Sequence, residues 1–285
     1  MSVDVILEQE YPRLARTAQQ WAAEWNRVGE QTAFYFRIIR DVGHALRAYP
    51  KEMLRLVAQM SMGTGALALI GGTVVIVGFL TLSAGALIAV QGYNMLAGVG
   101  VEALTGFTSA YLNVRIIGPL VTGIGMSATL GAGATAQLGA MRIAEEIDAL
   151  EVMGVRAVSY LASTRLIAGV VVVIPLYCIA VVMSFVAARF GTTAVYGQST
   201  GVYDHYFSTF LNPVDLLWSF LQAITMAVTV MVIHTYYGFN AAGGPAGVGE
   251  AVGRAVRASL VTVVFVTLVI SLAVYGQSGN FNLSG

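Results

Sequence analysis

Charge is scarce in this sequence. Only 11% of its 285 residues are Asp, Glu, Lys or Arg, whereas a soluble domain carries about a quarter. Hydrophobic residues make up 57%, the mean hydropathy is +0.75, and the formal net charge is zero. This balance excludes a soluble globular domain and gives no support to nucleic-acid binding. The sequence therefore predicts an integral membrane protein.

Residues that carry metal or nucleophilic chemistry are also few. The single cysteine, Cys178, excludes a disulfide framework. His44, His205 and His234 are too far apart in the sequence to form a local metal motif. The glycine-rich segment 238–253, which we interpret as a loop, lacks the Gly-Lys-Ser/Thr ending of a nucleotide-binding loop. We therefore expect no catalytic residue, no metal site and no cofactor on this chain.

Long stretches without charge are present instead. About 20 helical residues cross a hydrocarbon core of roughly 30 Å, and five charge-free runs are long enough. In lipid the backbone must satisfy its own hydrogen bonds, so we expect these runs to be helices. They cover residues 66–90, 116–140, 166–188, 216–237 and 258–276. The predicted fold class is an all-α membrane protein with five spans.

The basic residues predict the orientation of these spans. Thirteen of the fifteen fall before span one, between spans two and three, or between spans four and five. The positive-inside rule then places the N-terminus and these connections in the cytoplasm, and the tail 278–285 outside. The other two, Arg115 and Arg189, lie at predicted span ends, where long side chains reach the headgroups. We expect a multi-pass plasma-membrane protein with an outer loop at 191–213.

Residues 1–60 are predicted to form an amphipathic helical arm ahead of a membrane domain at 61–277. One apolar stripe consists of Leu14, Ala18, Trp21, Trp25 and Val28, and a second of Tyr35, Ile39, Val42 and Leu46. Basic residues beside Trp and Tyr favour helices that lie in the inner membrane surface, which we expect for residues 31–49. For the first thirty residues, packing on a soluble partner stays open as an alternative.

Small residues follow one another at every fourth position of span two. They are Gly123, Ser127, Gly131, Thr135 and Gly139. A face of this kind lets another helix approach closely. Packing within the same chain is one interpretation, and a subunit interface at a central helix is the other.

The densest charge cluster follows that span, at residues 142–151. We predict a helix in which Ile143, Ile147 and Leu150 share one face, while Arg142 and Glu146 pair at i, i+4. Further negative charge comes from Glu145, Asp148 and Glu151. A solvated helix without a partner is the alternative. The apolar stripe favours docking of a soluble protein.

Ionisable residues inside the predicted spans are almost absent. They mark ion pathways when they occur, so their scarcity argues against a proton- or sodium-coupled transporter. His234 is the exception, and we favour a hydrogen bond from it to a backbone carbonyl over a proton relay. An apolar cargo fits this composition better than an ion.

Two motifs carry a resemblance to a known family. Gly118-Pro119 and the run from Ala136 through Glu145-Glu146 to Gly154 resemble the MlaE/YrbE permeases, the membrane subunits of ABC-type lipid transporters that work with MCE proteins. Gln91-Gly92-Tyr93 also looks like the family's end of span one. The resemblance covers residue 37 to the C-terminus. Gln137 and Glu145-Glu146 resemble the B-type YrbE subunit of actinobacterial Mce systems.

This resemblance implies interfacial helices, five transmembrane helices forming a permease domain, and a cytoplasmic coupling helix at about 141–153. That helix would seat in a groove of an ATPase subunit. Carried over to this chain, its residues are Arg142, Glu145, Glu146, Asp148, Leu150 and Glu151. One departure is Ile116, where many members have an acidic residue after the arginine.

The implied function is that of a permease subunit in an ATP-driven, Mce-type importer of lipids such as fatty acids or sterols. ATP and Mg²⁺ would bind to the partner ATPase, an A-type sister permease would complete a heterodimer, and MCE proteins would deliver the cargo. The alternative is a passive membrane scaffold that anchors an extracellular MCE assembly and has no transport cycle.

Overall fold

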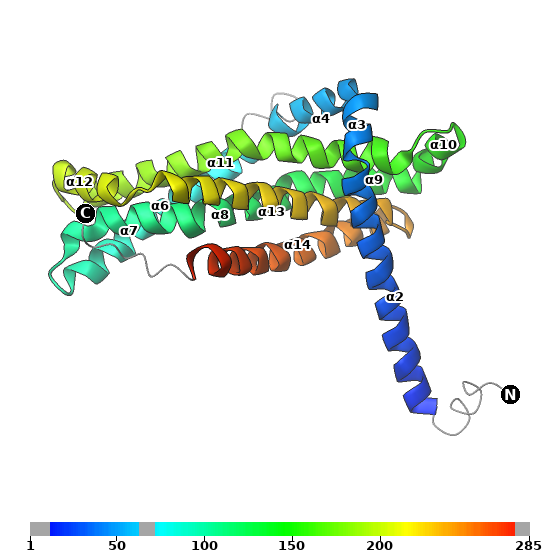
Figure 1. Ribbon diagram of the computed structural model, residues 1–285, viewed down its shortest axis with the longest axis horizontal. Coiled ribbons are helices and arrows are strands. Elements are labelled where there is room, and N and C mark those ends of the chain that lie inside the picture. Colours follow the sequence, from blue (N-terminus) through cyan, green and yellow to red (C-terminus); the bar gives the residue numbers. More distant parts are fainter. Residues whose placement is uncertain (1–11, 63–71, 277–285) are drawn as a thin grey trace.

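The computed structural model describes residues 12–62 and 72–276, which are helical and contain no strand (Figure 1). The tip of the predicted arm, the beginning of the predicted first span and the predicted tail at 278–285 lie outside the described residues. Five helices in the described ranges are long and apolar enough to cross a membrane. This confirms the predicted fold class.

The first span is α6, Thr73–Ala97, which continues beyond the predicted end at Val90. The second is a continuous run from Glu102 to Ile143. It is assembled from η1 (Glu102–Leu104), α7 (Thr105–Leu112), the π-helical turn η2 (Asn113–Ile117), α8 (Gly118–Met126), a second π-helical turn η3 (Ser127–Gly131) and α9 (Ala132–Ile143). Sequence hydropathy therefore identified the span but placed its start too late.

The third span follows the short helix α10, Glu146–Val152. It comprises the π-helical turn η4 (Val158–Ser163), α11 (Thr164–Phe190) and the π-helical turn η5 (Gly191–Val195). Pro175 lies inside α11, which continues past it to Phe190. Hydrogen bonding through the proline position is incomplete, since proline has no N–H.

The predicted outer loop at 191–213 is largely helical. It contains η5 and the helix α12, Thr200–Phe210, which packs on α7. Tyr203 is buried there and donates its hydroxyl to Ser109 Oγ at 2.8 Å. Gly106 lets the two helices approach, because a Cβ at this position would lie 2.4 Å from the Tyr203 carbonyl oxygen. The glycine and serine content of this segment suggests a loop, but most of the segment is helical.

The last two spans are α13, Pro213–Phe239, and α14, Gly244–Tyr275. Pro213 begins α13 and the side chain of Asn212 caps it by accepting a bond from Val214 N at 2.9 Å. The glycine-rich segment 238–253 is not a loop: its larger part forms the first turns of α14. Gly247 is required there, since a Cβ would lie 1.8 Å from the Ala242 carbonyl oxygen.

The arm consists of α2 (Pro12–Arg40), α3 (Val42–Ala48) and α4 (Pro50–Met62). In Figure 1, α2 crosses the bundle at the end where α10 lies, and α4 returns alongside α11. The buried face of α2 contains Phe34 and Ile38, whereas Ile39 and Leu46 of the predicted stripe are exposed. The arm is helical, and the predicted stripe is divided: Tyr35 and Val42 pack against the bundle, whereas Ile39 and Leu46 stay exposed and are left for the predicted contact with the membrane surface.

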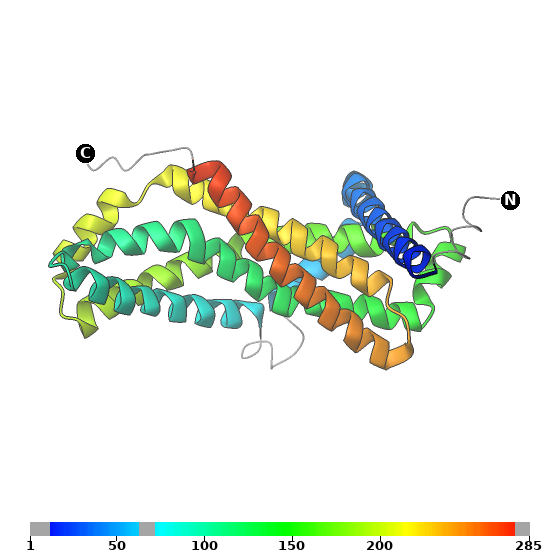
Figure 2. The ribbon, with the colours of Figure 1, turned by 90° about the horizontal axis from the view of Figure 1, so that it is seen from below.

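The two ends of the bundle differ (Figures 1 and 2). One end, which we call the α10 end, carries α10, α2 and the turn between α13 and α14. The other, the α12 end, carries α12 and the turn between α6 and α7. The main core lies between them and includes Met126, Leu176, Met226 and Val230. From the turn between α6 and α7 onward, successive connections between spans lie alternately at the α12 end and the α10 end, in the predicted order.

Candidate functional site

The segment 141–153 is not one helix as predicted. α9 ends at Ile143, and Glu145 adopts a left-handed conformation with φ 60° and ψ 14° before α10 begins at Glu146. Such a conformation is uncommon for a residue with a side chain, and it interrupts the helix between α9 and α10. α10 is therefore a separate short helix at the tip of the bundle (Figure 1).

The apolar residues of α10 face the protein's own core. Ile147 is fully buried and forms a cluster with Leu138, Ala157 and Leu161, and Leu150 packs against that cluster. Two of the three residues of the predicted docking stripe, Ile147 and Leu150, are therefore used within the chain, whereas the third, Ile143, is exposed. The exposed large apolar side chains of this segment are Val152, which is 89% exposed, Met153 and Ile143.

The charges of α10 pair differently from the prediction. Arg142 Nη1 lies 2.5 Å from Asp148 Oδ1, so the expected pair with Glu146 is wrong. The left-handed turn at Glu145 causes the difference, because it interrupts the helical i, i+4 register. Within the described part of the chain, Glu145, Glu146 and Glu151 are exposed and form no ion pair. α10 thus presents an acidic outer surface beside Val152 and Met153.

The small-residue stripe of span two packs against α13 and α14 of the same chain. A Cβ added at Gly123 would lie 2.8 Å from Met226 Sδ. One added at Gly131 would lie 2.5 Å from the His234 ring, and one added at Gly139 would lie 2.9 Å from Val248 Cγ1. Ser127 and Thr135 hydrogen-bond to residues of the same two helices. Of the two interpretations of this stripe, the structure therefore shows packing against other helices of the same chain.

The π-helical turn η3 keeps this stripe in line. Four residues of an α-helix advance about 40° beyond a full turn, so a strict four-residue repeat rotates away from its partner by about 160° over four steps. A π-helical turn is wider, with i to i+5 bonding, and it reduces that rotation. Ser127 and Gly131 are the first and last residues of η3. All five small residues consequently remain buried against one pair of helices.

His234 forms a buried hydrogen-bond cluster at the crossing of α9, α13 and α14. Its Nδ1 lies 2.8 Å from Thr135 Oγ1, and its Nε2 lies 3.0 Å from Ser259 Oγ. Ser127 Oγ is 3.4 Å from the same Nε2 and 2.5 Å from Ser259 Oγ. The ring therefore has hydroxyl partners in addition to the backbone of Gly131, which supplies the kind of partner that we expected. The cluster ties three spans together.

Sequence reasoning missed a pair of charges inside the bundle. Arg115 lies in η2 rather than at a span end, and its Nη2 is 2.7 Å from Asp215 Oδ2 in the first turn of α13. The guanidinium also stacks at 4.1 Å from the ring centroid of Tyr111 and at 4.3 Å from that of Tyr275. A signal was available, since Asp215 is the acidic residue nearest the start of span four. We expected that start to be loop.

An apolar groove of ≈ 510 Å³ lies between α6 and α11 toward the α12 end. Its walls include Leu82, Val90, Val186 and Phe190, and Tyr196 lies at its edge. Apart from Ser83 and the Tyr196 hydroxyl, its lining side chains carry no polar group. The groove can accommodate a hydrocarbon chain but offers little to bind a polar solute.

Among residues 12–62 and 72–276, no group of three or more His, Cys, Asp or Glu side chains lies close enough to hold a metal ion. The recognisable features are instead an acidic helix at the bundle tip, tightly packed spans and an apolar groove. They define a multi-pass helical membrane protein. The family described as "Permease MlaE" matches residues 62–273, and the chain belongs to this family.

Curated relatives carry related names. The chain is 28% identical over 184 residues to "Protein TRIGALACTOSYLDIACYLGLYCEROL 1, chloroplastic" of Arabidopsis thaliana, covering 64% of this chain and 52% of that protein. This chain thus spans about half the length of the plant relative. It is 25% identical over 235 residues to a "Probable ABC transporter permease protein" of Rickettsia felis, covering 81% and 90%. It is also 25% identical over 196 residues to the "Intermembrane phospholipid transport system permease protein MlaE" of Haemophilus influenzae, covering 67% and 74%.

Proposed function

We propose that this chain is the permease subunit of an ATP-driven lipid importer of the Mce type. In this proposal a separate ATPase binds ATP and Mg²⁺, an A-type sister permease pairs with this B-type chain, and MCE proteins feed lipid into a hydrophobic pathway. The names of the relatives support the ABC transporter class and a phospholipid-like cargo. The apolar groove between α6 and α11 supports an apolar cargo.

The acidic surface of α10 carries the proposal. Glu145, Glu146 and Glu151 form no ion pair within the described residues, and Val152 and Met153 lie exposed beside them. An exposed apolar pair bordered by charge is typical of a protein-binding surface. We assign this surface to the ATPase, with Arg142 and Asp148 holding the turn and Leu150 packing beneath it.

The packing under α10 explains how movement of an ATPase reaches the spans. Ile147 contacts Leu138 of α9 and Leu161 of η4, which belong to spans two and three. A displacement of α10 therefore acts on both spans directly. The His234 cluster then links α9 to α13 and α14.

Charge reversal tests the proposed docking. The triple variant Glu145→Lys, Glu146→Lys, Glu151→Lys should lose co-purification of the ATPase while membrane insertion and thermal stability stay unchanged, because none of the three side chains supports the fold. A matched control reverses Glu30 and Glu250, which are exposed acids on α2 and α14. The control should retain the ATPase. Normal ATPase recovery with the triple variant would refute the docking role.

Lipid uptake with a hydrolysis-inactive ATPase tests the transport cycle. The proposed importer stops when hydrolysis stops. A passive scaffold, the alternative function, would continue downhill transfer of lipid under the same conditions. Radiolabelled fatty acid or sterol uptake into whole cells distinguishes the two.

A further inference from the structure

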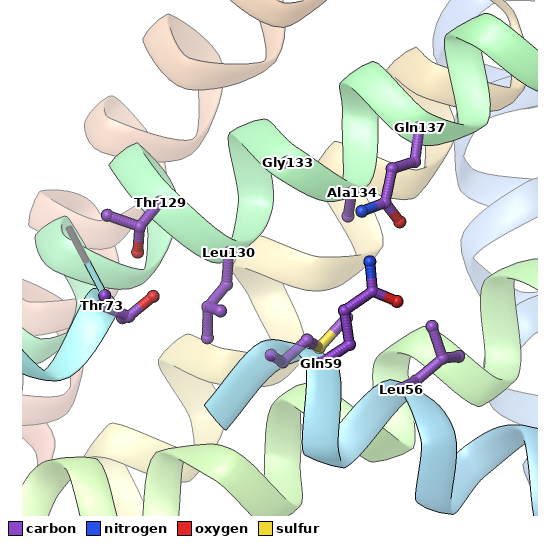
Figure 3. Close-up of a pocket in the computed structure, with 10 residues that line it drawn as sticks. Leu56, Gln59, Thr73, Thr129, Leu130, Gly133, Ala134 and Gln137 are labelled. Atoms are coloured by element: carbon purple, nitrogen blue, oxygen red, sulfur yellow. The ribbon is translucent and has the colours of Figure 1, made fainter. Parts of the chain in front are cut away.

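A cavity of ≈ 340 Å³ lies between α4, the first turn of α6 and the η3–α9 part of span two (Figure 3). Its polar lining consists of the amides of Gln59 and Gln137 and the hydroxyls of Thr73 and Thr129. Figure 3 shows the two amides facing one another across it. The lining contains no charged side chain. It is separate from α10 and from the apolar groove.

Arg165 lies directly behind this lining. Its Nη2 donates to Gln137 Oε1 at 3.4 Å, and its Nη1 donates to the Leu161 carbonyl oxygen at 2.9 Å. The residue is only 4% exposed, and its buried Nε has no hydrogen-bond partner. Among the described residues no carboxylate lies within 4.0 Å of the guanidinium, so a buried positive charge has only neutral partners.

The nearest charged groups do not cancel this charge. Glu52 and Arg55 of α4 act on Arg165 from a distance. However, Glu52 accepts two hydrogen bonds from Arg55, at 2.8 and 2.5 Å, and is thereby committed to that residue. The three groups together leave one positive charge in excess. Burial of a charge without a counter-charge is costly, which indicates that an anion belongs nearby.

We propose that this cavity binds a phosphate oxyanion, presented by the headgroup of an anionic glycerophospholipid. Arg165 supplies the positive charge from behind the lining, and because Gln137 Oε1 accepts from Arg165, the amide N–H of Gln137 is left to donate to the anion. Gln59 and Thr73 donate further hydrogen bonds, whereas the Thr129 hydroxyl already donates to the Gly125 carbonyl oxygen at 2.7 Å and only lines the cavity. The first turn of α6 lines the same cavity, and the positive end of its helix dipole favours an anion. The site requires no transport cycle and stands apart from the function proposed above.

The substitution Gln137→Glu is the sharpest test. It is nearly isosteric and places a carboxylate beside Arg165, so it should raise the melting temperature while repelling the phosphate. Gly133→Leu provides a second variant, since a Cβ at Gly133 meets nothing within 4 Å and a leucine there fills the cavity. Arg156→Gln is the control, because it removes an exposed positive charge at the same end of the bundle.

The full chain is reconstituted in phosphatidylcholine bilayers with and without phosphatidylglycerol, and the retained lipid is identified by native mass spectrometry. Wild type and Arg156→Gln should retain phosphatidylglycerol in preference to phosphatidylcholine. Both cavity variants should lose that preference by about tenfold, as expected for charge-assisted hydrogen bonds. Equal retention of the two lipids by wild type, or unchanged retention of phosphatidylglycerol by Gln137→Glu, would overturn the proposal.

Thermal shift in detergent separates the possible sources of the phosphate. If inorganic phosphate raises the Tm of wild type but not of Gln137→Glu, a free anion suffices. If only phosphatidylglycerol does so, the acyl chains are needed as well. Both results support an oxyanion site, whereas equal responses of the two proteins to either probe contradict it. ATPase co-purification is measured in parallel, so a failure here is distinguishable from a failure of the α10 assignment.

Discussion

Arg115 and Asp215 are a hundred residues apart in the sequence, yet Nη2 of the arginine lies 2.7 Å from Oδ2 of the aspartate. Their side chains are only 18% and 17% exposed. The pair joins span two to the first turn of span four, and two tyrosine rings flank the guanidinium. A largely buried charge pair is sensitive to the loss of either partner.

We predict that Asp215→Asn destabilises the protein by about 3 kcal/mol, since it leaves a partly buried guanidinium without its counter-charge. Unfolding by denaturant in mixed micelles measures this loss. The double variant Arg115→Met, Asp215→Leu should recover most of the stability, because it removes both charges together.

The Arg189–Asp204 pair is a matched control for that measurement. Its N···O distance is also 2.7 Å, but the two side chains are 52% and 49% exposed. Asp204→Asn should therefore cause a much smaller loss, because water screens this pair. Equal losses at the two sites would contradict burial as the cause.

The same exposed pair predicts a dependence on pH. Hydrogen bonds from Arg189 lower the pKa of Asp204 below its ordinary value of 3.8. A carboxylate with a lowered pKa in the folded state stabilises the fold above its unfolded pKa and loses that contribution as the pH falls through its folded pKa. The difference in Tm between wild type and Asp204→Asn should be constant from neutral pH to about pH 5 and shrink below about pH 4. A difference that grows on acidification would show the opposite sign.

The small-residue stripe offers a pair of neighbouring glycines with opposite expectations. In Gly131→Ala the new Cβ would lie 2.5 Å from the His234 ring, which must move and weaken its hydrogen bonds, so we expect a loss of about 2 kcal/mol. Gly133→Ala meets nothing within 4 Å and should be neutral or stabilising, since alanine favours helix. Thermal unfolding of the two variants side by side tests this. Equal effects would show that the close approach at Gly131 does not matter.

Two apolar residues of the α10 segment should respond differently to truncation. Ile147 is fully buried, so Ile147→Ala should cost about 3 kcal/mol of stability. Val152 is exposed, so Val152→Ser should leave the Tm unchanged but weaken ATPase binding if this surface docks the ATPase. Pull-down of the ATPase together with a melting curve for each variant separates the two effects. Full ATPase binding by Val152→Ser would remove this residue from the docking surface.

Hydropathy predicted the five spans because charge is excluded from lipid, and that rule does not depend on the details of packing. It could not predict the π-helical turns, since no residue type marks them. Their cost is met by tertiary bonds such as that from Ser219 Oγ to the Val114 carbonyl oxygen in η2, at 2.5 Å. The beginning of α14 was missed for a related reason. A glycine such as Gly247 suggests a loop, but here the absence of a Cβ allows a close contact with the Ala242 carbonyl oxygen. That contact exists only in the folded chain and cannot be read from the sequence.

At the candidate site, the composition predicted an acidic helix but not which of its side chains face the protein's own core. Ile147 fits a docking stripe and an internal core equally well, because periodicity identifies an apolar face without identifying what covers it. The pairing of Arg142 failed because one left-handed residue, Glu145, broke the assumed register. Glutamate carries no local signal for that conformation. Asp215 was overlooked because its partner is distant in the sequence.

The position of Ile147 also restricts how this end of the molecule can move. Its neighbours Leu138 and Leu161 belong to two different spans, and Leu150 packs against the same cluster, so α10 is anchored to both spans at once. A force on the exposed end of α10 at Val152 therefore acts on both spans through the same buried contact. Spans two and three are therefore expected to tilt together rather than slide past one another.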